Sequence, residues 1–469
     1  MQKKPSFDTG LQKNQIIELE ITGMADQGMA IGKYEGQVVF VPLCAPGDLC
    51  RVKVLKALKR MAYGKLVELI RPAHSRIEPE CHVFAQCGGC CFLHIDYQEE
   101  LRIKERMVSD ALCRIGGFSG LPIEPIIGAD SRKAYRNKAL FPIGEDPQGG
   151  VVLGFYSRNS HRLVACDSCL LQPEGFKAAM DAFREWAKKY GDSVYDERTH
   201  SGVMRWLYIR EAAATGQMMI CVVINGQRLR HERELVQVLR ANVPGLASVI
   251  INSNRERTNV ALGKSFRTIF GEDHIVDKLC GLEFEISPQS FYQVNRDGAQ
   301  RLYGIAAQYA DLKPGELLLD LYCGTGTVGL SVLNQGESGA RLVGVEVTKS
   351  AVEDARRNAK RNGIENARFI CGDAARAVAE LESEGLHPDV VVLDPPRKGC
   401  APQLIDTVAR LAPRKIVYIS CDPATLARDL KLFSMYSSQG FSPVRCRPVD
   451  MFPGTGHVET IVSIQRKTS

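Results

Sequence analysis

An apolar strand turns directly into a glycine loop at Leu317-Leu318-Leu319-Asp320-Leu321-Tyr322-Cys323-Gly324-Thr325-Gly326. Around it, apolar and amphipathic segments alternate. They predict strands near 315–320, 341–346, 367–371, 389–394 and 415–420, with helices near 327–335, 349–362 and 402–411. Two more strands, near 441–447 and 458–465, close the sheet. This alternation predicts a doubly wound, Rossmann-like α/β domain over residues 282–469.

The glycine loop is compatible with two kinds of ligand. Gly324, Gly326 and Gly329 fit the Gly-x-Gly-x-x-Gly pattern of nicotinamide dinucleotide sites. Asp320, however, precedes the first glycine by four residues, which is the Asp-x-x-x-Gly-x-Gly spacing of S-adenosylmethionine-dependent methyltransferases. Its carboxylate can order the loop and face a cationic methionine group, whereas it would repel a pyrophosphate. The loop therefore favours S-adenosylmethionine.

Further acids end the next three strands. Glu346 closes the second strand and can accept hydrogen bonds from both ribose hydroxyls, and Asp373 follows the third, where it can reach the adenine amino group. Each acid alone could simply cap the following helix. Asp394 ends the fourth strand in Asp394-Pro395-Pro396-Arg397, a stiff turn that can form one wall of a pocket for a planar base. Amino-group methyltransferases use a similar turn, so nitrogen methylation stays open.

A cysteine follows the fifth strand, in Val417-Tyr418-Ile419-Ser420-Cys421-Asp422-Pro423. A lone cysteine is more often a core residue, but Cys421 shares its sheet edge with the acids. The C5 atom of uracil is a poor nucleophile until a thiolate adds to C6 and makes an enolate, which can attack a methyl sulfonium. A base must then remove the C5 proton. Glu459 is the candidate, although alone it would be a surface carboxylate, and His457 is expected to hydrogen-bond or pack.

Residues 11–72 predict a small β-barrel of the oligonucleotide-binding kind. Strands are expected at Ile16–Ile21, Gln37–Pro42, Leu49–Leu55 and Gly64–Ile70, with turns at intervening glycines. Lys53, Lys56, Lys59 and Arg60 surround the last connection, as a solvated hairpin or as a contact for a phosphate backbone. Gly-Gln-Val-Val-Phe-Val-Pro (36–42) and the Pro-Gly pair (46–47) resemble a TRAM domain, a small RNA-binding β-barrel.

Clustered cysteines follow the barrel. Cys81, Cys87 and Cys90 form a Cys-x5-Cys-Gly-Gly-Cys arrangement, whose glycines let the thiolates converge on a soft metal or an iron–sulfur cluster. A fourth thiolate would come from Cys166 or Cys169. The five-residue gap is longer than the short pairs of structural zinc sites, so the spacing favours iron–sulfur over zinc and over unligated thiols.

The central α+β region, residues 73–281, carries this cluster. A charged amphipathic helix is expected over 97–115 and another over 173–189. Tyr135-Arg136-Asn137-Lys138 and Met204-Arg205-Trp206-Leu207-Tyr208-Ile209-Arg210 place cations beside aromatics on probable strands. Such a face could stack unpaired bases. An ordinary half-buried strand has the same pattern, however, and we favour this interpretation.

Composition sets outer limits on the function. A chain of 469 residues is too long for one compact core, so several domains are expected. The net charge of +6 (60 − 54) is small, so any binding of polyanions must use local basic patches. Residues 1–10 show no signal peptide and no apolar run could span a membrane, so a cytoplasmic location without disulfides is expected. No obligate protein partner is predicted.

Taken together, Ser-Cys-Asp-Pro (420–423) and Gly-His-Val-Glu (456–459) resemble the 5-methyluridine RNA methyltransferase family over essentially the whole chain. The likeness is to the bacterial 23S ribosomal RNA uracil-C5 enzymes with a TRAM domain and an iron–sulfur cluster. It implies a multidomain enzyme that methylates C5 of a uridine in 23S rRNA. The alternatives are a tRNA uracil-C5 methyltransferase, a nitrogen methyltransferase, or a non-catalytic iron–sulfur RNA-binding protein.

The resemblance also implies roles for individual residues. The nucleophile would be Cys421 and the base Glu459. Contacts with S-adenosylmethionine would come from Gln293, Tyr322, Glu346, Asp373 and Asp394, and a 4Fe-4S cluster would be held by Cys81, Cys87, Cys90 and Cys169. The helix near 97–115 would pack with the catalytic domain. Asp422 stands where other members have Asn, and it could tune the thiol or hydrogen-bond the turn.

Overall fold

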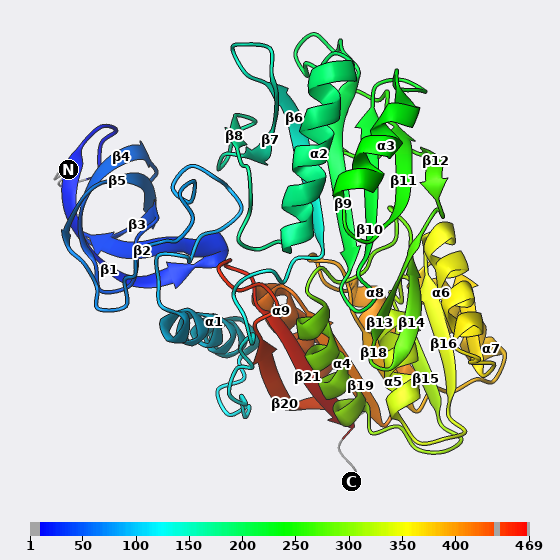
Figure 1. The fold of residues 1–469 in the computed structure, drawn as a ribbon. Coiled ribbons are helices and arrows are strands. Elements are labelled where there is room, and N and C mark those ends of the chain that lie inside the picture. Colours follow the sequence, from blue (N-terminus) through cyan, green and yellow to red (C-terminus); the bar gives the residue numbers. More distant parts are fainter. Residues whose placement is uncertain (1–9, 436–440, 467–469) are drawn as a thin grey trace, which may run out of the picture.

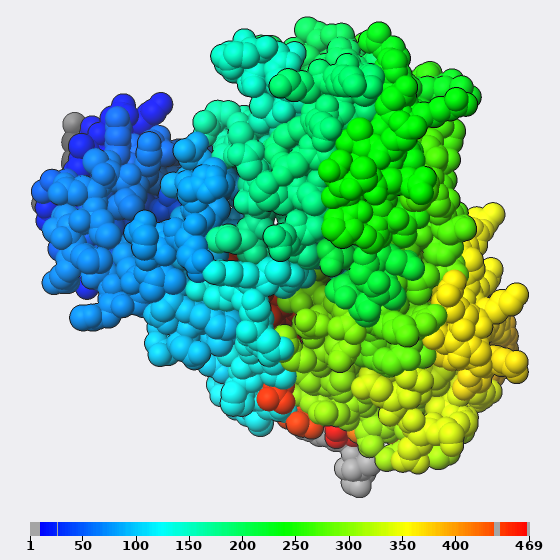
Figure 2. Space-filling model, in the orientation of Figure 1, coloured from blue at the N-terminus to red at the C-terminus, as the bar shows by residue number. Residues whose placement is uncertain are grey.

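The computed structural model describes residues 10–435 and 441–466. Residues 1–9, on which the expectation about a signal peptide rests, lie outside the described residues. Figure 1 shows a barrel, a central sheet with helices on its front face, and a C-terminal α/β layer. In Figure 2 the barrel forms a lobe beside the rest of the molecule. No helix in the described part of the chain has the length and apolar character needed to cross a membrane.

The barrel closes through five strands in the order β1-β2-β3-β5-β4. They are β1 (Ile16–Ala25), β2 (Met29–Tyr34), β3 (Gln37–Pro42), β4 (Leu49–Ala57) and β5 (Met61–Arg71). The sequence does not predict β2, because Gly28 and Gly32 suggest turns. Gly32 instead lies within the strand, where a Cβ atom would come 2.5 Å from the carbonyl oxygen of Glu20. The glycine thus permits close approach of β1 and β2.

The central sheet has the order β12-β11-β10-β9-β6-β7-β8. Its strands are β6 (Lys138–Glu145), β7 (Val151–Tyr156), β8 (Leu163–Ala165), β9 (Met204–Ala212), β10 (Gln217–Ile224), β11 (Leu246–Ser253) and β12 (Ser265–Gly271). Helices α2 (Glu174–Tyr190) and α3 (Glu232–Asn242) cover one face (Figure 1). Tyr208 and Arg210 of β9 are buried, so they belong to the core and cannot stack bases.

The C-terminal sheet has the order β17-β16-β15-β18-β19-β21-β20 after a hairpin of β13 (Ile275–Leu279) and β14 (Leu282–Ile286). Strands β15 to β19 are parallel and β20 and β21 antiparallel. The strands are β15 (Leu317–Leu321), β16 (Arg341–Glu346), β17 (Ala367–Cys371), β18 (Val390–Leu393), β19 (Lys415–Ser420), β20 (Phe441–Val449) and β21 (Glu459–Arg466). This is the doubly wound topology expected from the alternation.

Alternate residues of each strand face opposite layers, as in buried parallel sheets. Leu318 packs with α4, α5 and α6, whereas Leu319 packs with α7, α8 and α9. The helices are α4 (Arg296–Ala310), α5 (Thr327–Gln335), α6 (Lys349–Arg361), α7 (Ala374–Ser383), α8 (Pro402–Arg410) and α9 (Pro423–Met435). The sequence analysis does not predict α7 and α9, although each begins directly after a capping aspartate, Asp373 or Asp422.

The segment between barrel and central sheet lies on the C-terminal layer. Helix α1 (Tyr97–Ala111) runs into a single π-helical turn, Leu112–Gly116. Val108 and Leu112 share a core with Leu426 and Leu430 of α9. Further along, Ile123 and Ile127 form parallel bridges to β20, which cover the open edge of the sheet.

The barrel meets the C-terminal layer at two glycines. A Cβ atom on Gly456, in the β20–β21 loop, would lie 2.7 Å from the amide nitrogen of Gly28. Gly28 in turn has a φ of +71° and faces the Cys91 side chain. The barrel turn therefore abuts the loop with no room for a side chain.

Replacing Gly456 with Ala should force these backbones apart. We expect a loss of about 1–3 kcal/mol, as for other overpacked sites, seen as a lower midpoint of thermal unfolding. Gly23→Ala is the matched control in the barrel, because a Cβ atom there would meet no atom within 4 Å. An unchanged midpoint for Gly456→Ala would contradict this tight contact.

Candidate active site

A cavity of about 910 Å³ opens at the carboxyl edge of the parallel strands. Parallel strands end at the same edge, and the antiparallel β21 begins there, with Thr460 paired to Ser420. The cavity is therefore reached by residues from six strand ends and one preceding segment. All seven residues that the sequence predicts for catalysis or donor binding line it: Gln293, Tyr322, Glu346, Asp373, Asp394, Cys421 and Glu459.

The loop after β15 forms one wall of the cavity. Tyr322 has a φ of 67°, a left-handed conformation that costs free energy for a non-glycine residue. Gly324 and Gly326 follow, also with positive φ. Glu346 accepts hydrogen bonds from the amides of Gly324 (3.3 Å) and Thr348 (2.8 Å), so its carboxylate ties two strand-end loops together.

Asp320, which was expected to order the loop and face a methionine group, is not among the residues that line the cavity. Its Oδ2 accepts a hydrogen bond from the amide of Gly329 at 2.8 Å, behind the loop. Burial raises the pKa of Asp320 to about 8. The carboxyl group thus orders the start of α5, directly after the glycine loop that it was expected to order.

Asp373 and Asp394 occupy different environments. Asp373 is exposed and caps α7, accepting hydrogen bonds from the amides of Ala375 (3.1 Å) and Arg376 (3.3 Å). Asp394, after β18, is half-buried, and burial raises its pKa to about 7. A carboxyl group that titrates near neutral pH can donate or accept a hydrogen bond beside a substrate.

The segment 290–295, which carries Gln293, is fixed by the central sheet. The buried guanidinium of Arg210 donates to the carbonyl oxygens of Ser290 (2.9 Å) and Tyr292 (3.0 Å). Asn137 donates through Nδ2 to the carbonyl of Gln293 at 2.9 Å. Gln293 is therefore held in the cavity from the domain that precedes it in the chain.

Cys421 stands in the turn between β19 and α9. Burial raises the pKa of its thiol to about 11, Glu459 adds to this shift, and Arg397 opposes it. The neighbouring Asp422 caps α9, with Oδ1 accepting from the amides of Ala424 (3.0 Å) and Thr425 (2.9 Å). Asp422 therefore hydrogen-bonds the turn.

Glu459 begins β21 and is 5% exposed. Burial raises its pKa to about 8, Asp394 adds to the shift, and Arg397 opposes it. A base with a pKa close to the working pH is well suited to accept a proton from a substrate carbon. His457 lies 3.2 Å from Arg397, and burial lowers its pKa to about 4, so the imidazole is neutral.

Several cavity residues were not singled out from the sequence. Arg397 is part of the Asp-Pro-Pro-Arg turn. Its positive charge lowers the pKa of both Cys421 and Glu459. Phe291 is 61% exposed and lines the cavity, and its position two residues before Gln293 could have marked it. Nothing in the sequence around Phe452 indicates that it lines the cavity, because only the fold brings the β20–β21 loop to this edge.

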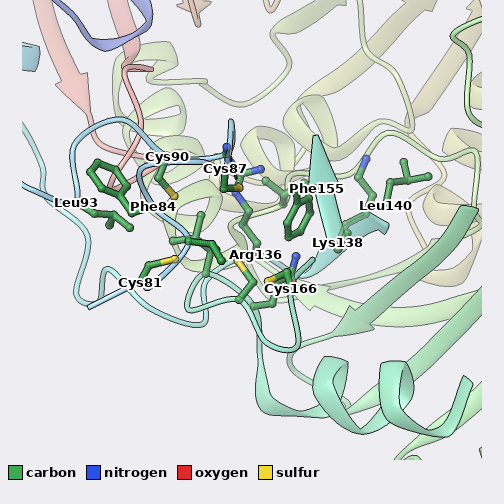
Figure 3. Close-up of a pocket in the computed structure, with 17 residues that line it drawn as sticks. Cys81, Phe84, Cys87, Cys90, Leu93, Arg136, Lys138, Leu140, Phe155 and Cys166 are labelled. Atoms are coloured by element: carbon green, nitrogen blue, oxygen red, sulfur yellow. Dashed lines mark hydrogen bonds between the residues drawn. The ribbon is translucent and has the colours of Figure 1, made fainter. Parts of the chain in front are cut away.

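A second cavity, of about 280 Å³, is lined by all five cysteines considered as cluster ligands, the four predicted ones and the alternative Cys166. Cys81, Cys87 and Cys90 come from one loop and Cys166 from the segment after β8, with Arg136 beside them (Figure 3). Cys169 also lines this cavity, and Arg136 and Lys138 line both cavities. The cysteine site and the active site therefore share a wall.

The thiols surround this cavity and do not meet at one point. His, Cys, Asp and Glu side chains are the candidate metal ligands. Among the described residues, three of their ligand atoms lie within 4.8 Å of one another only at Cys44, Asp48 and Cys50 in the barrel. There Arg76 already pairs with Asp48 at 2.8 Å, which disfavours a cation. A single zinc ion would need thiolate sulfurs about 3.8 Å apart, and in the described part of the chain no three of the five cysteines around the second cavity come that close to one another.

The profile of the tRNA (uracil-5-)-methyltransferase family matches residues 233–467, and that of the TRAM domain matches residues 10–67. An RNA methyltransferase of Clostridium tetani is 41% identical, with 97% of each chain covered. The chain belongs to this methyltransferase family. An RNA methyltransferase of Halalkalibacterium halodurans is 36% identical, covering 97% of this chain and 98% of the relative.

The enzyme also resembles a solved structure over nearly its whole length. The tRNA (uracil-54, C5)-methyltransferase of Pyrococcus abyssi, in complex with S-adenosyl-L-homocysteine, superposes with a TM-score of 0.76 at 26% identity. The match covers 95% of this chain and 99% of that one. The enzyme is thus an S-adenosylmethionine-dependent RNA methyltransferase of the uracil-C5 family, and the expectation of a TRAM barrel is confirmed.

Replacing Arg397 with Leu should slow alkylation of Cys421. Without the cation, the pKa of the thiol rises further above about 11. Since the thiolate is the nucleophile, the iodoacetamide rate at a fixed pH should fall about tenfold for each pKa unit. Mass spectrometry of the Cys421 peptide measures this rate. The exposed Cys371 is the internal control, and an unchanged Cys421 rate would contradict the assigned role of Arg397.

Proposed function

We propose that the enzyme methylates C5 of a uridine in RNA through a covalent bond between Cys421 and C6. The observation that carries this proposal is the convergence of a thiol, a buried carboxyl group and a cation at one cavity: Cys421, Glu459 and Arg397. Methylation of a nitrogen atom needs no nucleophile from the enzyme. It would therefore give no role to a thiol placed beside a carboxyl group and a cation. A non-catalytic RNA-binding protein would not need a carboxyl group enclosed beside a thiol.

The reaction uses each of these groups in turn. The Cys421 thiolate adds to C6, and the electron pair of the C5–C6 double bond moves onto the enolate. C5 then attacks the methyl group of the co-substrate S-adenosylmethionine, and S-adenosylhomocysteine leaves. Glu459 takes the C5 proton, the double bond re-forms, and the C6–S bond breaks to release the thiolate. Arg397 favours the anionic forms of both Cys421 and Glu459.

The co-substrate would occupy the wall formed by β15, β16 and β17. We propose contacts from Gln293, Tyr322, Glu346, Asp373 and Asp394, all of which line the cavity. Glu346 ends β16, where an acid can accept hydrogen bonds from the ribose hydroxyls. Asp394, with a pKa near 7, stands between this wall and Cys421 and would contact the reacting base or the donor.

The barrel offers a surface for the flanking RNA. Tyr63 is 39% exposed and stacks on Phe40, with ring centroids 5.5 Å apart. Lys56 of β4 pairs with Tyr63 across the strands. An aromatic platform beside a cation can stack an unpaired base and neutralise its phosphate. A base inside a duplex would have to leave its stack to enter the cavity.

We propose 23S rRNA as the substrate, on the resemblance of the cysteine spacing to the iron–sulfur enzymes of this family. A tRNA is the second candidate, because the Pyrococcus abyssi protein is named as a tRNA enzyme and matches 95% of this chain. Five per cent of 469 residues is about 23, fewer than the 58 of the TRAM match, so part of the barrel is shared with that protein. The barrel therefore does not separate the two substrates.

The second cavity fits a 4Fe-4S cluster, and we propose Cys81, Cys87, Cys90 and Cys169 as its ligands. Cys166 is the poorer ligand because its Sγ already donates to the carbonyl of Ser168 at 2.9 Å. The Leu171 amide and Arg136 both lower the pKa of Cys169 against the effect of burial. A bound cluster would join the cysteine loop to the segment after β8.

We further propose domain boundaries at 11–72, 73–281 and 282–469, with the helix near 97–115 belonging to the catalytic layer. Helix α1 supports this division because Val108 is buried against α9 residues.

An RNA that contains 5-fluorouridine should form a denaturation-resistant adduct with Cys421, because fluorine cannot leave as a proton. Electrophoresis detects the adduct and mass spectrometry locates it. Cys421→Ala should form no adduct and no 5-methyluridine, whereas the control Cys371→Ala should do both. Comparing 23S rRNA and tRNA transcripts identifies the substrate. Methylation without any adduct would overturn the thiol mechanism.

Cys169→Ser should remove the iron–sulfur cluster, whereas Cys166→Ser should retain it. Iron and acid-labile sulfide per chain, with the visible absorption of the cluster, measure the difference. Zinc with no sulfide in the wild-type protein would contradict the cluster, and retention by Cys169→Ser would contradict this ligand.

A further inference from the structure

A buried ion cluster lies beneath the loop that leads to Glu459. Lys104 of α1 is fully buried and contacts Glu100 (2.8 Å) and Asp450 (2.7 Å). Arg132 pairs with the other oxygen of Glu100 at 3.0 Å. Two cations and two carboxylates thus balance inside the protein. Burial alone would lower the pKa of Lys104, but Glu100 and Asp450 raise it, so Lys104 is charged.

These charges hold the backbone of the β20–β21 loop. Lys104 donates to the carbonyl of Phe452 at 3.2 Å, and Glu100 accepts from the amide of Gly454 at 2.7 Å. Asp450 accepts from the amide of Phe452 at 3.1 Å. Since Val449 pairs with Glu459, the loop between them sets how β21 begins.

Other elements bond the same short loop. Tyr135 donates to the carbonyl of Pro453 (3.0 Å), Asn295 to that of Met451 (2.9 Å), and the amides of Cys91 and Phe92 to that of Gly454 (2.9 and 3.0 Å). Lys104 differs from these partners because it joins Asp450, Glu100 and Phe452 at once. Its loss would leave the two carboxylates facing each other with only Arg132 to balance them.

We propose that Lys104, with Glu100 and Asp450, is a positioning residue for Glu459. None of these three residues lines the active-site cavity, so the effect of the cluster would fall on the step that Glu459 performs. That step is removal of the C5 proton, in which the C5–H electrons re-form the double bond and the C6–S pair returns to Cys421. This inference rests on the proposed covalent function.

The test uses the full-length enzyme and S-adenosylmethionine with two RNAs. One contains ordinary uridine and the other contains 5-fluorouridine. Lys104→Met should form the fluorouridine adduct at a rate within about twofold of wild type, because Cys421 and its turn lie on other elements. With ordinary RNA it should accumulate the denaturation-resistant adduct about tenfold or more while turnover falls, the effect expected of a misplaced base. Glu459→Gln provides the reference for a lost base and should show the same accumulation.

Arg414→Met is the matched control, because Arg414 pairs with Glu316 at 2.6 Å at the opposite end of the sheet. It should not accumulate adduct. Tyr97→Phe is the milder variant, since it keeps the packing and removes the 2.9 Å hydrogen bond to Asp450 together with the 2.6 Å bond that the hydroxyl accepts from the amide of Ala129. It should accumulate adduct to a smaller extent, and it decides the question if Lys104→Met does not fold.

Two results would overturn the positioning role alone. One is that fluorouridine adduct formation and turnover fall together without accumulation, as for a purely structural defect. The other is that the folded variants match wild type in every measurement. If the wild-type enzyme forms no fluorouridine adduct, the covalent function fails and the positioning role fails with it.

Discussion

The backbone of Gly454 joins most parts of the molecule. Its carbonyl accepts the amides of Cys91 and Phe92, and its amide donates to Glu100 of α1. Two residues later, Gly456 touches the barrel turn at Gly28. The cysteine loop, the barrel and α1 are therefore fixed on the loop that precedes Glu459. Buried backbone groups need partners, and here those partners come from distant elements.

The chemistry depends on burial at the sheet edge. Asp394, Cys421 and Glu459 all have pKa values raised chiefly by burial, and Arg397 is the cation that opposes this for Cys421 and Glu459. A low-dielectric site strengthens every interaction among these groups. In the mechanism that we propose, the same enclosure lets a carboxyl group accept a proton from carbon near neutral pH.

Much of the C-terminal layer could be predicted because its strands carry strong local signals. β16, β17 and β19 match their expected ranges, and apolar runs bounded by acids mark their ends. α7 and α9 were missed because their capping acids were weighed as ligands or turn residues. β2 was missed because glycine suggests a turn unless a neighbouring strand is known to press against it. For Asp320 the sequence predicts that the carboxylate orders the glycine loop, but the partner, the amide of Gly329, is known only from the structure.

The sequence by itself determined which side chains share the active-site edge. Parallel strands end together, so Glu346, Asp373, Asp394 and Cys421 follow from their order along the chain. Only the tertiary structure decided what holds the loop that precedes Glu459. Lys104 and Asp450 are 346 residues apart, and contacts between such distant residues leave no periodic pattern in either segment. Arg136 likewise borders both the cysteine cavity and the active site only because the central sheet packs against the C-terminal layer.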